Sequence, residues 1–242
     1  MTPEIWVLCG SAATIAFVHT IMGPDHYLPF VAMAKSREWS VARAMRNTLI
    51  CGAGHIVGSV VLGFVGIYAS IQLGALEAIE GFRGDLAAWA LVSVGLIWMA
   101  WGLRKGYKKH SHAHWHSHGE TRHYHDHSHV HEHAHAHGVE EVVRHPDGKR
   151  SLAGWTIFIV FVLGPCEPLI PILMFPAAKE SMVGILAVTS VFAVVTVLTM
   201  LGAVALSVWG LKSIRLPVVE RYSEAVAGCT IMMCGLSISV LG

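Results

Sequence analysis

Two short polar motifs interrupt long apolar stretches of this 242-residue chain. The first is Gly-Pro-Asp-His at 23–26, and the second is Gly-Pro-Cys-Glu at 164–167. Imidazole, carboxylate and thiolate groups together suit a borderline divalent transition metal better than Mg²⁺ or Ca²⁺. A charged side chain at the bilayer centre is costly unless it is paired or coordinated, so such residues indicate an ion or proton pathway. The candidate metal ligands are His19, Asp25, His26, His55, Cys166 and Glu167.

The spacing of these residues constrains how they could share an ion. His19 and His26 are seven positions apart, so a continuous helix would separate them by about 10 Å along its axis. Both reach one ion only if the chain unwinds between them, at the Gly-Pro pair. Asp25 is either a direct ligand or a partner that orients an imidazole. His55 is either a ligand or a histidine that only bonds a neighbouring helix, and Glu167 is also a candidate for proton coupling.

A second metal signal lies in residues 110–137, where thirteen histidines alternate with mostly polar residues. The segment has too few apolar residues to form a core, so we expect a disordered loop that chelates metal in many registers. The alternative is a disordered polar loop without a metal-binding role, which became rich in histidine by neutral drift. The histidines are His110, His112, His114, His116, His118, His123, His125, His127, His129, His131, His133, His135 and His137.

The composition indicates an integral membrane protein, because 54% of the residues are hydrophobic and 14% are charged, against about 25% charged residues in ordinary soluble domains. The first and fourth apolar stretches each contain a Gly-Pro pair. The amino terminus lacks a positively charged region, so we expect the first stretch to remain in the mature protein. Six stretches are long enough to span a bilayer, near 5–34, 47–73, 86–103, 152–176, 183–211 and 223–241.

The basic residues predict the orientation of these spans. Fifteen of the 17 lysines and arginines fall in the odd-numbered connections, which the positive-inside rule assigns to the cytoplasm. We therefore expect a multi-pass protein of a bacterial inner membrane, with both termini outside and the histidine-rich loop in the cytoplasm.

Three spans in each half imply that the halves enter the membrane in opposite senses. The predicted fold is thus an all-α membrane protein of six transmembrane helices, arranged as two inverted three-helix repeats with helices 1 and 4 broken. The parts are a first repeat at 1–103, a loop at 104–151 and a second repeat at 152–242. Matching broken helices in inverted repeats indicate a substrate site near the midplane, whereas the alternative is that each Gly-Pro pair only kinks a helix. Gly95, Gly202 and Gly235 are expected at close helix contacts.

These motifs resemble those of the nickel/cobalt transporter superfamily, which includes membrane proteins similar to urease accessory protein H and has a lysine-exporter-type fold. The resemblance rests on His-Thr-Ile-Met-Gly-Pro-Asp-His at 19–26, on Gly-Pro-Cys-Glu-Pro at 164–168 and on the histidine-rich loop. Five residues separate His19 from Asp25, where the family signature has four. The resemblance implies Ni²⁺ or Co²⁺ as cargo, with Zn²⁺ as an alternative.

The expected function is secondary transport of a divalent transition metal, and not an enzymatic reaction. The alternatives are an accessory protein for metalloenzyme maturation, a transporter of another solute regulated by metal, and an intramembrane metallohydrolase. The last is disfavoured because His131-Glu132-His133, where an HExxH motif would start, belongs to the low-complexity histidine-rich loop and not to an apolar stretch. Expected partners are lipids, the metal ion, a cytoplasmic metal chaperone and a second copy of the chain. Nucleic acid is not expected, because no long basic stretch is present. The histidine-rich loop is compatible with both import and export.

Overall fold

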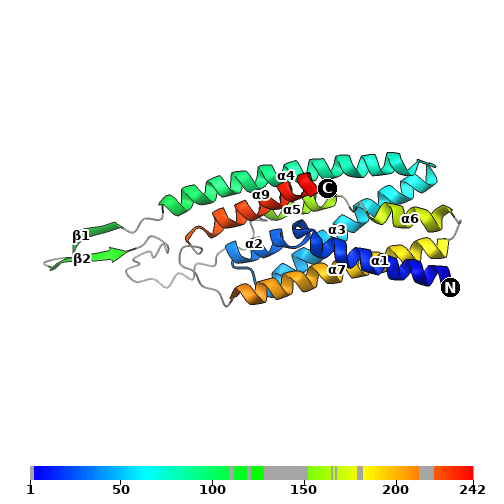
Figure 1. Ribbon diagram of the computed structural model, residues 1–242. Coiled ribbons are helices and arrows are strands. Elements are labelled where there is room, and N and C mark those ends of the chain that lie inside the picture. The colour runs from blue at the N-terminus through cyan, green and yellow to red at the C-terminus, as the bar shows by residue number, and fades with distance from the viewer. Residues whose placement is uncertain are drawn as a thin grey trace.

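The computed structural model of the chain describes residues 3–108, 112–118, 121–127, 152–164, 166, 168–178, 182–212 and 221–241. Its helices run roughly along one long axis, and a two-stranded hairpin projects from one end (Figure 1). The elements are α1 (Pro3–Met22), η1 (Pro24–His26), α2 (Leu28–Ser36), α3 (Val41–Tyr68), α4 (Leu73–Lys108), β1 (His112–His118), β2 (Thr121–His127), α5 (Leu152–Leu163), α6 (Leu169–Ala178), α7 (Met182–Lys212) and α9 (Ser223–Leu241).

Five helices in the described part of the chain are long and apolar enough to cross a membrane, namely α1, α3, α4, α7 and α9. Large apolar side chains are exposed along them, among them Ile97 at 70% and Leu206 at 71%. An apolar surface of this extent is unfavourable in water but matches a lipid environment. The prediction of a multi-pass membrane protein with helical spans is confirmed at this level.

The apolar stretch predicted as a broken span at 152–176 forms two short helices. α5 has 12 residues and α6 has 10, whereas crossing the hydrocarbon takes about 20 helical residues. α5 ends immediately before Gly164 and α6 begins at Leu169, so the helix breaks at the second Gly-Pro motif. The count of six spans and the inverted repeat stay predictions.

The first helix also breaks at its Gly-Pro motif. Gly23 has an extended backbone, with φ −88° and ψ 93°, because the ring of Pro24 disfavours the helical conformation in the residue before it. Residues 24–26 then form the 3-10 turn η1. Tyr27 closes this turn, since its backbone N–H donates to the carbonyl oxygen of Pro24 at 3.3 Å. Asp25 and His26 are therefore held between the ends of α1 and α2.

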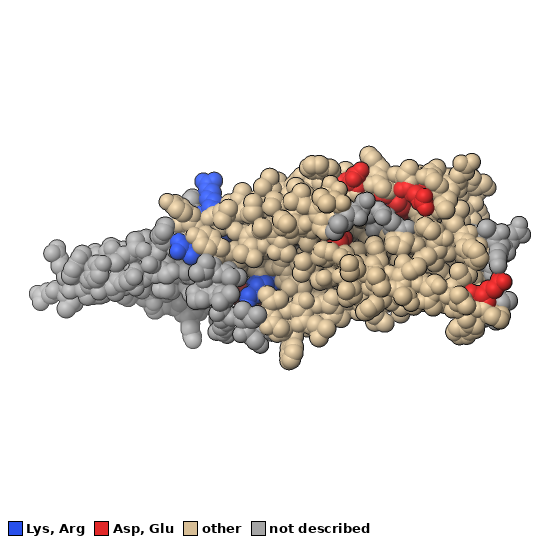
Figure 2. Space-filling model, in the orientation of Figure 1, with Lys and Arg blue, Asp and Glu red and all other residues tan. Residues whose placement is uncertain are grey.

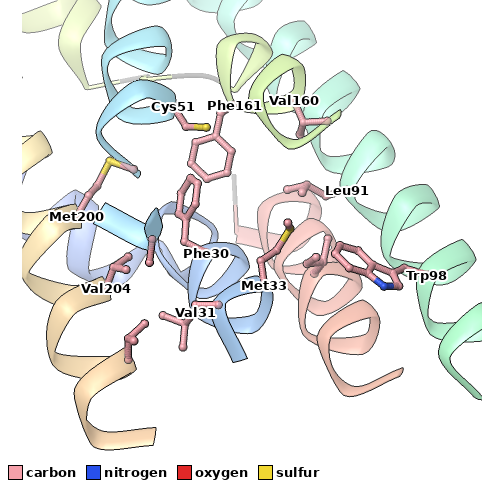
Figure 3. Packing of buried hydrophobic residues seen from close by; sticks show 14 of the residues in the cluster. Phe30, Val31, Met33, Cys51, Leu91, Trp98, Val160, Phe161, Met200 and Val204 are labelled. Atoms are coloured by element: carbon pink, nitrogen blue, oxygen red, sulfur yellow. The ribbon is translucent and has the colours of Figure 1, made fainter. Parts of the chain in front are cut away.

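A buried apolar cluster packs α2 against α3, α4, α5, α7 and α9 (Figure 3). Phe30 of α2 and Phe161 of α5 lie at its centre, with ring centroids 4.7 Å apart and exposures of 1% and 6%. α2 follows the first break and α5 precedes the second, so this contact joins the two broken helices. Met200 and Val204 of α7 complete the same cluster.

α4 and α9 form the most extensive helix pair, and they run antiparallel. A Cβ atom added to Gly95 would collide with the backbone nitrogen of Met232, and one added to Gly235 would lie 2.6 Å from the carbonyl oxygen of Ala88. The two backbones touch because neither glycine carries a side chain. The predicted contacts of Gly95 and Gly235 are confirmed. The prediction for Gly202 is wrong, because a Cβ there would meet nothing within 4 Å.

Part of the histidine-rich segment folds differently from the prediction of a disordered loop at 104–151. Residues 104–108 continue α4, and β1 pairs with β2 in an antiparallel hairpin from His112 opposite His127 to His118 opposite Thr121. The physical reason is that strict alternation is a period of two, which is also the period of a strand. His110, His129, His131, His133, His135 and His137 lie outside the described residues.

Charged side chains are distributed unevenly along the long axis. On the face shown in Figure 2, lysine and arginine side chains gather near the end that carries the hairpin, whereas most of the visible aspartate and glutamate side chains lie elsewhere. The amino terminus lies at the end opposite the hairpin (Figure 1). The two ends of the bundle therefore differ in charge.

Candidate functional site

Three predicted ligands meet in the interior of the bundle. The imidazole of His26 in η1 contacts that of His19 from α1 and that of His55 from α3, with ring centroids 4.9 Å and 5.2 Å apart. Both contacts are edge-to-face, with interplanar angles of 80° and 84°. His26 and His55 are each 3% exposed. We call these side chains the three-histidine cluster. The break at Gly23 is what brings His26 beside His19, as the spacing predicted.

In two of these rings, those of His26 and His55, the Nδ1 atom makes a hydrogen bond. Nδ1 of His26 lies 3.1 Å from the carbonyl oxygen of Gly23 and 3.3 Å from Oδ2 of Asp25. Nδ1 of His55 lies 3.2 Å from the carbonyl oxygen of Phe161. A carbonyl oxygen only accepts, so Nδ1 is the donor in both rings, and in the neutral imidazole Nε2 then carries a lone pair.

The Nε2 atoms of His19, His26 and His55 are all buried without a hydrogen-bond partner. A buried polar atom without a partner costs about 1–3 kcal/mol. The same arrangement is typical of metal-binding histidines, whose second ring nitrogen donates to a carbonyl or carboxylate oxygen. His26 and His55 therefore have the supporting hydrogen bonds and the Nε2 lone pairs that are typical of metal ligands.

The three rings do not yet surround a common point. Within the described residues, no group of three or more histidine, cysteine, aspartate or glutamate side chains is arranged to hold a metal ion. The rings pack against each other instead, and an ion could enter only if they turned about their side-chain torsions. The structure thus shows a cluster of available nitrogen ligands, not an assembled coordination site.

Asp25 lies at the edge of the cluster, with 22% of its side chain exposed. Its contact with Nδ1 of His26 matches the predicted orienting role, and direct coordination by Asp25 stays a prediction.

The second motif does not join the cluster in the same way. Cys166 is fully buried in a separate apolar cluster with α1, α6 and α7, where Ala12, Leu169 and Phe192 are among its neighbours. Its carbonyl oxygen accepts the first hydrogen bond of α6, from the N–H of Leu169 at 2.9 Å. Glu167, the other predicted ligand of this motif, lies outside the described residues.

A buried ion pair that the sequence did not indicate lies at the second break. Arg83 of α4 contacts Oε1 of Glu80 at 2.7 Å, and Glu80 is 1% exposed. The sequence predicts that residues 80 and 83 lie in a loop, because the third apolar stretch begins at 86. In the structure both residues belong to α4, which begins at Leu73. The available signal was the spacing: a glutamate and an arginine three residues apart lie on one helix face and offset each other's charge.

A second unpredicted ion cluster lies nearer the hairpin end. Glu224 of α9 accepts a hydrogen bond from Nε1 of Trp98 at 2.6 Å. Its carboxylate also lies 3.7 Å from Arg37, just after α2, and 3.6 Å from Lys105 of α4. These contacts join α2, α4 and α9 at one end of the bundle.

Comparison with protein-family models, with curated proteins and with solved structures finds no match to this chain. The likeness to the nickel/cobalt transporter superfamily therefore rests on the motifs alone and stays a proposal.

Proposed function

We propose that the protein is a secondary transporter of a divalent transition-metal cation, with Ni²⁺ or Co²⁺ as the preferred cargo. The cargo binds within the membrane through His19, His26 and His55, and Asp25 orients His26 and adds negative charge. The observation that carries this proposal is the set of three contacting imidazoles whose buried Nε2 atoms have no partner.

The energetic argument concerns those three nitrogen atoms. A chain that only needed to pack would replace such a cluster with apolar side chains, since each unpaired atom is destabilising. A ligand that accepts all three lone pairs reverses this penalty. Neutral imidazole binds nickel, cobalt, zinc and copper, whereas Mg²⁺ and Ca²⁺ prefer oxygen ligands. The ligand types support a transition metal, and the motif resemblance narrows the choice to nickel or cobalt.

The packing of the helices supports the proposed inverted repeat, in which α1–α2, α3 and α4 correspond to α5–α6, α7 and α9. Under this correspondence, the packing of α1 on α7 matches that of α5 on α3, the packing of α2 on α7 matches that of α6 on α3, and the packing of α2 on α9 matches that of α6 on α4. The pairs α3–α7 and α4–α9, which are also in contact, each map onto themselves. Rocking of one half against the other would then give alternating access.

Contacts between the three-histidine cluster and the hairpin end of the bundle support a cargo pathway that is closed on the hairpin side. α2 runs from the cluster toward the hairpin (Figure 1). Along this path Phe30 contacts Phe161, and Arg37 pairs with Glu224. We propose that both contacts open when the cargo passes to the hairpin side.

The histidine-rich segment is proposed to gather or buffer metal in the cytoplasm. Its position at the basic end of the bundle supports this orientation. Metal accumulation in cells that express the protein decides the direction: a gain of nickel indicates import, and a loss indicates export.

The proposal is tested by nickel flux in vesicles that contain the purified chain. We expect His26→Ala and Asp25→Ala to abolish flux, because each removes a ligand or its support. The matched control is His145→Ala, a histidine outside both the cluster and residues 110–137. Unchanged flux in His26→Ala would refute the site. Nickel binding without flux in the unaltered protein would favour the accessory role, and flux of another solute would favour a transporter of that solute regulated by metal.

A further inference from the structure

The carboxyl end of α5 lies inside the bundle at the second break, where the N–H of Gly164 donates to the carbonyl oxygens of Val160 and Phe161 at 2.9 Å and 3.2 Å. Side chains of other helices bind the same helix end. Arg83 donates from Nη2 to the carbonyl oxygen of Val162 at 2.9 Å and to that of Gly164 at 3.4 Å. His55 donates from Nδ1 to the carbonyl oxygen of Phe161 at 3.2 Å. A helix ends in unpaired carbonyl groups with about half a negative charge. Two side chains from other helices therefore hold this helix end.

The guanidinium of Arg83 is enclosed by three helices. Its side chain is 17% exposed, and Nη1 lies 2.7 Å from Oε1 of Glu80 on the preceding turn of α4. Gly58 of α3 provides the space, because a Cβ there would lie 2.9 Å from both Nη2 of Arg83 and the carbonyl oxygen of Val162. The glutamate balances the charge of the arginine. The buried pair therefore adds little net charge to the interior that a divalent cation has to enter.

Broken-helix transporters commonly bind a coupling cation at such a place, because unwound carbonyls and half-helix carboxyl ends coordinate Na⁺ or H⁺. We propose that Arg83 is a tethered cation that occupies this position permanently, so that no free metal cation binds at the carboxyl end of α5. Arg83 is thereby a positioning residue, since it fixes the helix end whose Phe161 carbonyl orients His55. Only this last role rests on the proposed transport function.

The geometry explains why arginine fills this position. Its planar fork presents several N–H groups at fixed angles, so one side chain reaches a carboxylate and two carbonyl oxygens, whereas a lysine ammonium is a single point charge. Replacement of Arg83 by alanine would leave Oε1 of Glu80 and the carbonyl oxygens of Val162 and Gly164 around a vacated space. Three oxygen atoms with one negative charge are ligands that suit a hard cation such as Na⁺.

The experiment measures thermal unfolding of the full-length, detergent-purified chain without any transition metal. Unaltered protein, Arg83→Ala and Arg83→Lys are compared in choline chloride, in sodium chloride and in low, non-denaturing guanidinium chloride at equal ionic strength. We expect Arg83→Ala to have a lowered Tm in choline and to regain at least about 2 °C in sodium or guanidinium, because bound cations stabilise the folded state. The unaltered protein and Arg83→Lys should show no such difference between salts.

An equal Tm of Arg83→Ala in all three salts would overturn the proposal, as would an equal gain in the unaltered protein. If Arg83→Ala does not fold, Arg83→Gln decides, because its amide still donates to a carbonyl but carries no positive charge. It should show the same selective gain, and its absence overturns the proposal. A cation response without nickel flux would refute the proposed transport function alone. Flux without a cation response would refute the tethered cation alone.

Discussion

The two breaks in the bundle share a Gly-Pro motif but use it differently. At the first break the motif itself supplies polar side chains, since Asp25 and His26 lie in the turn between α1 and α2. At the second break the described residues supply mainly backbone carbonyls, and the side chains that bind them come from His55 and Arg83 of other helices. The first break presents ligands, whereas the second is held in place by its neighbours.

This difference shows that a Gly-Pro helix break in a membrane protein can either present ligands or be bound by neighbouring helices. Proline frees backbone groups that hydrocarbon cannot satisfy, so a break persists only where other groups satisfy them. Tyr27 and the turn itself close the first break locally. Arg83 closes the second from a distance, and in doing so connects it to α3 and α4. His55 belongs to both, because it joins the three-histidine cluster and also bonds the carboxyl end of α5.

The largest contrast is expected between ligand substitutions at the two breaks. His26→Ala should lower nickel affinity by more than about 100-fold, since the loss of a ligand exceeds the effect of its supporting groups. Cys166→Ala should lower it by less than about 10-fold, because Cys166 packs among apolar side chains and such groups act on a site only indirectly. Equilibrium binding to protein lacking residues 110–137 measures both. Equal losses would mean that the second motif coordinates the cargo too.

A smaller contrast is expected from adding one methyl group at each break. A Cβ at Gly23 would lie 2.5 Å from Nδ1 of His26, whereas a Cβ at Gly164 would lie 3.2 Å from Nδ1 of His55. Gly23→Ala must displace the His26 ring and should lower nickel affinity by about 10-fold or more. Gly164→Ala requires a shift of only a few tenths of an ångström and should cost less. Gly202→Ala is the control, since its Cβ would meet nothing within 4 Å. The reverse order of the two effects would contradict the comparison.

The sequence predicted the first break more completely than the second, and the reason is physical. At the first break the ligands and the helix breaker are adjacent, so the spacing of His19 and His26 around the Gly-Pro pair already implied that they meet. At the second break the partners of the free carbonyls lie on other helices. The charges of Glu80 and Arg83 predicted a polar connection between two spans. The sequence alone does not reveal that the two side chains pair with each other beside the end of α5.

The same distinction applies to the rest of the fold. Apolar length predicted six spans, because hydrocarbon thickness sets that length directly, and five of them overlap a described helix that is long and apolar enough to cross a membrane. Small residues alone did not identify contacts, since Gly95 and Gly235 touch a neighbouring backbone and Gly202 does not. Alternating histidines in residues 110–137 fit both a disordered chain and a strand, so composition did not predict the hairpin.

The smallest effect on transport is expected far from both breaks. Deletion of residues 110–137 should leave nickel flux measurable and change the apparent affinity by a few fold, because the segment concentrates metal near the membrane but does not carry it across. Flux in vesicles over a range of nickel concentrations measures this. Complete loss of flux in a folded, membrane-inserted protein would move the transport site from the first break to the histidine-rich segment.

The most direct test of the central claim is the ligand environment of nickel bound to the chain without residues 110–137. X-ray absorption of this protein, loaded with one equivalent of Ni²⁺, reports the imidazole ligands through their multiple scattering. The account predicts a shell of nitrogen and oxygen atoms with more than one imidazole, reduced in His26→Ala and unchanged in His145→Ala. A shell without imidazole, or no bound nickel at all, would contradict the claim that the three-histidine cluster binds the cargo.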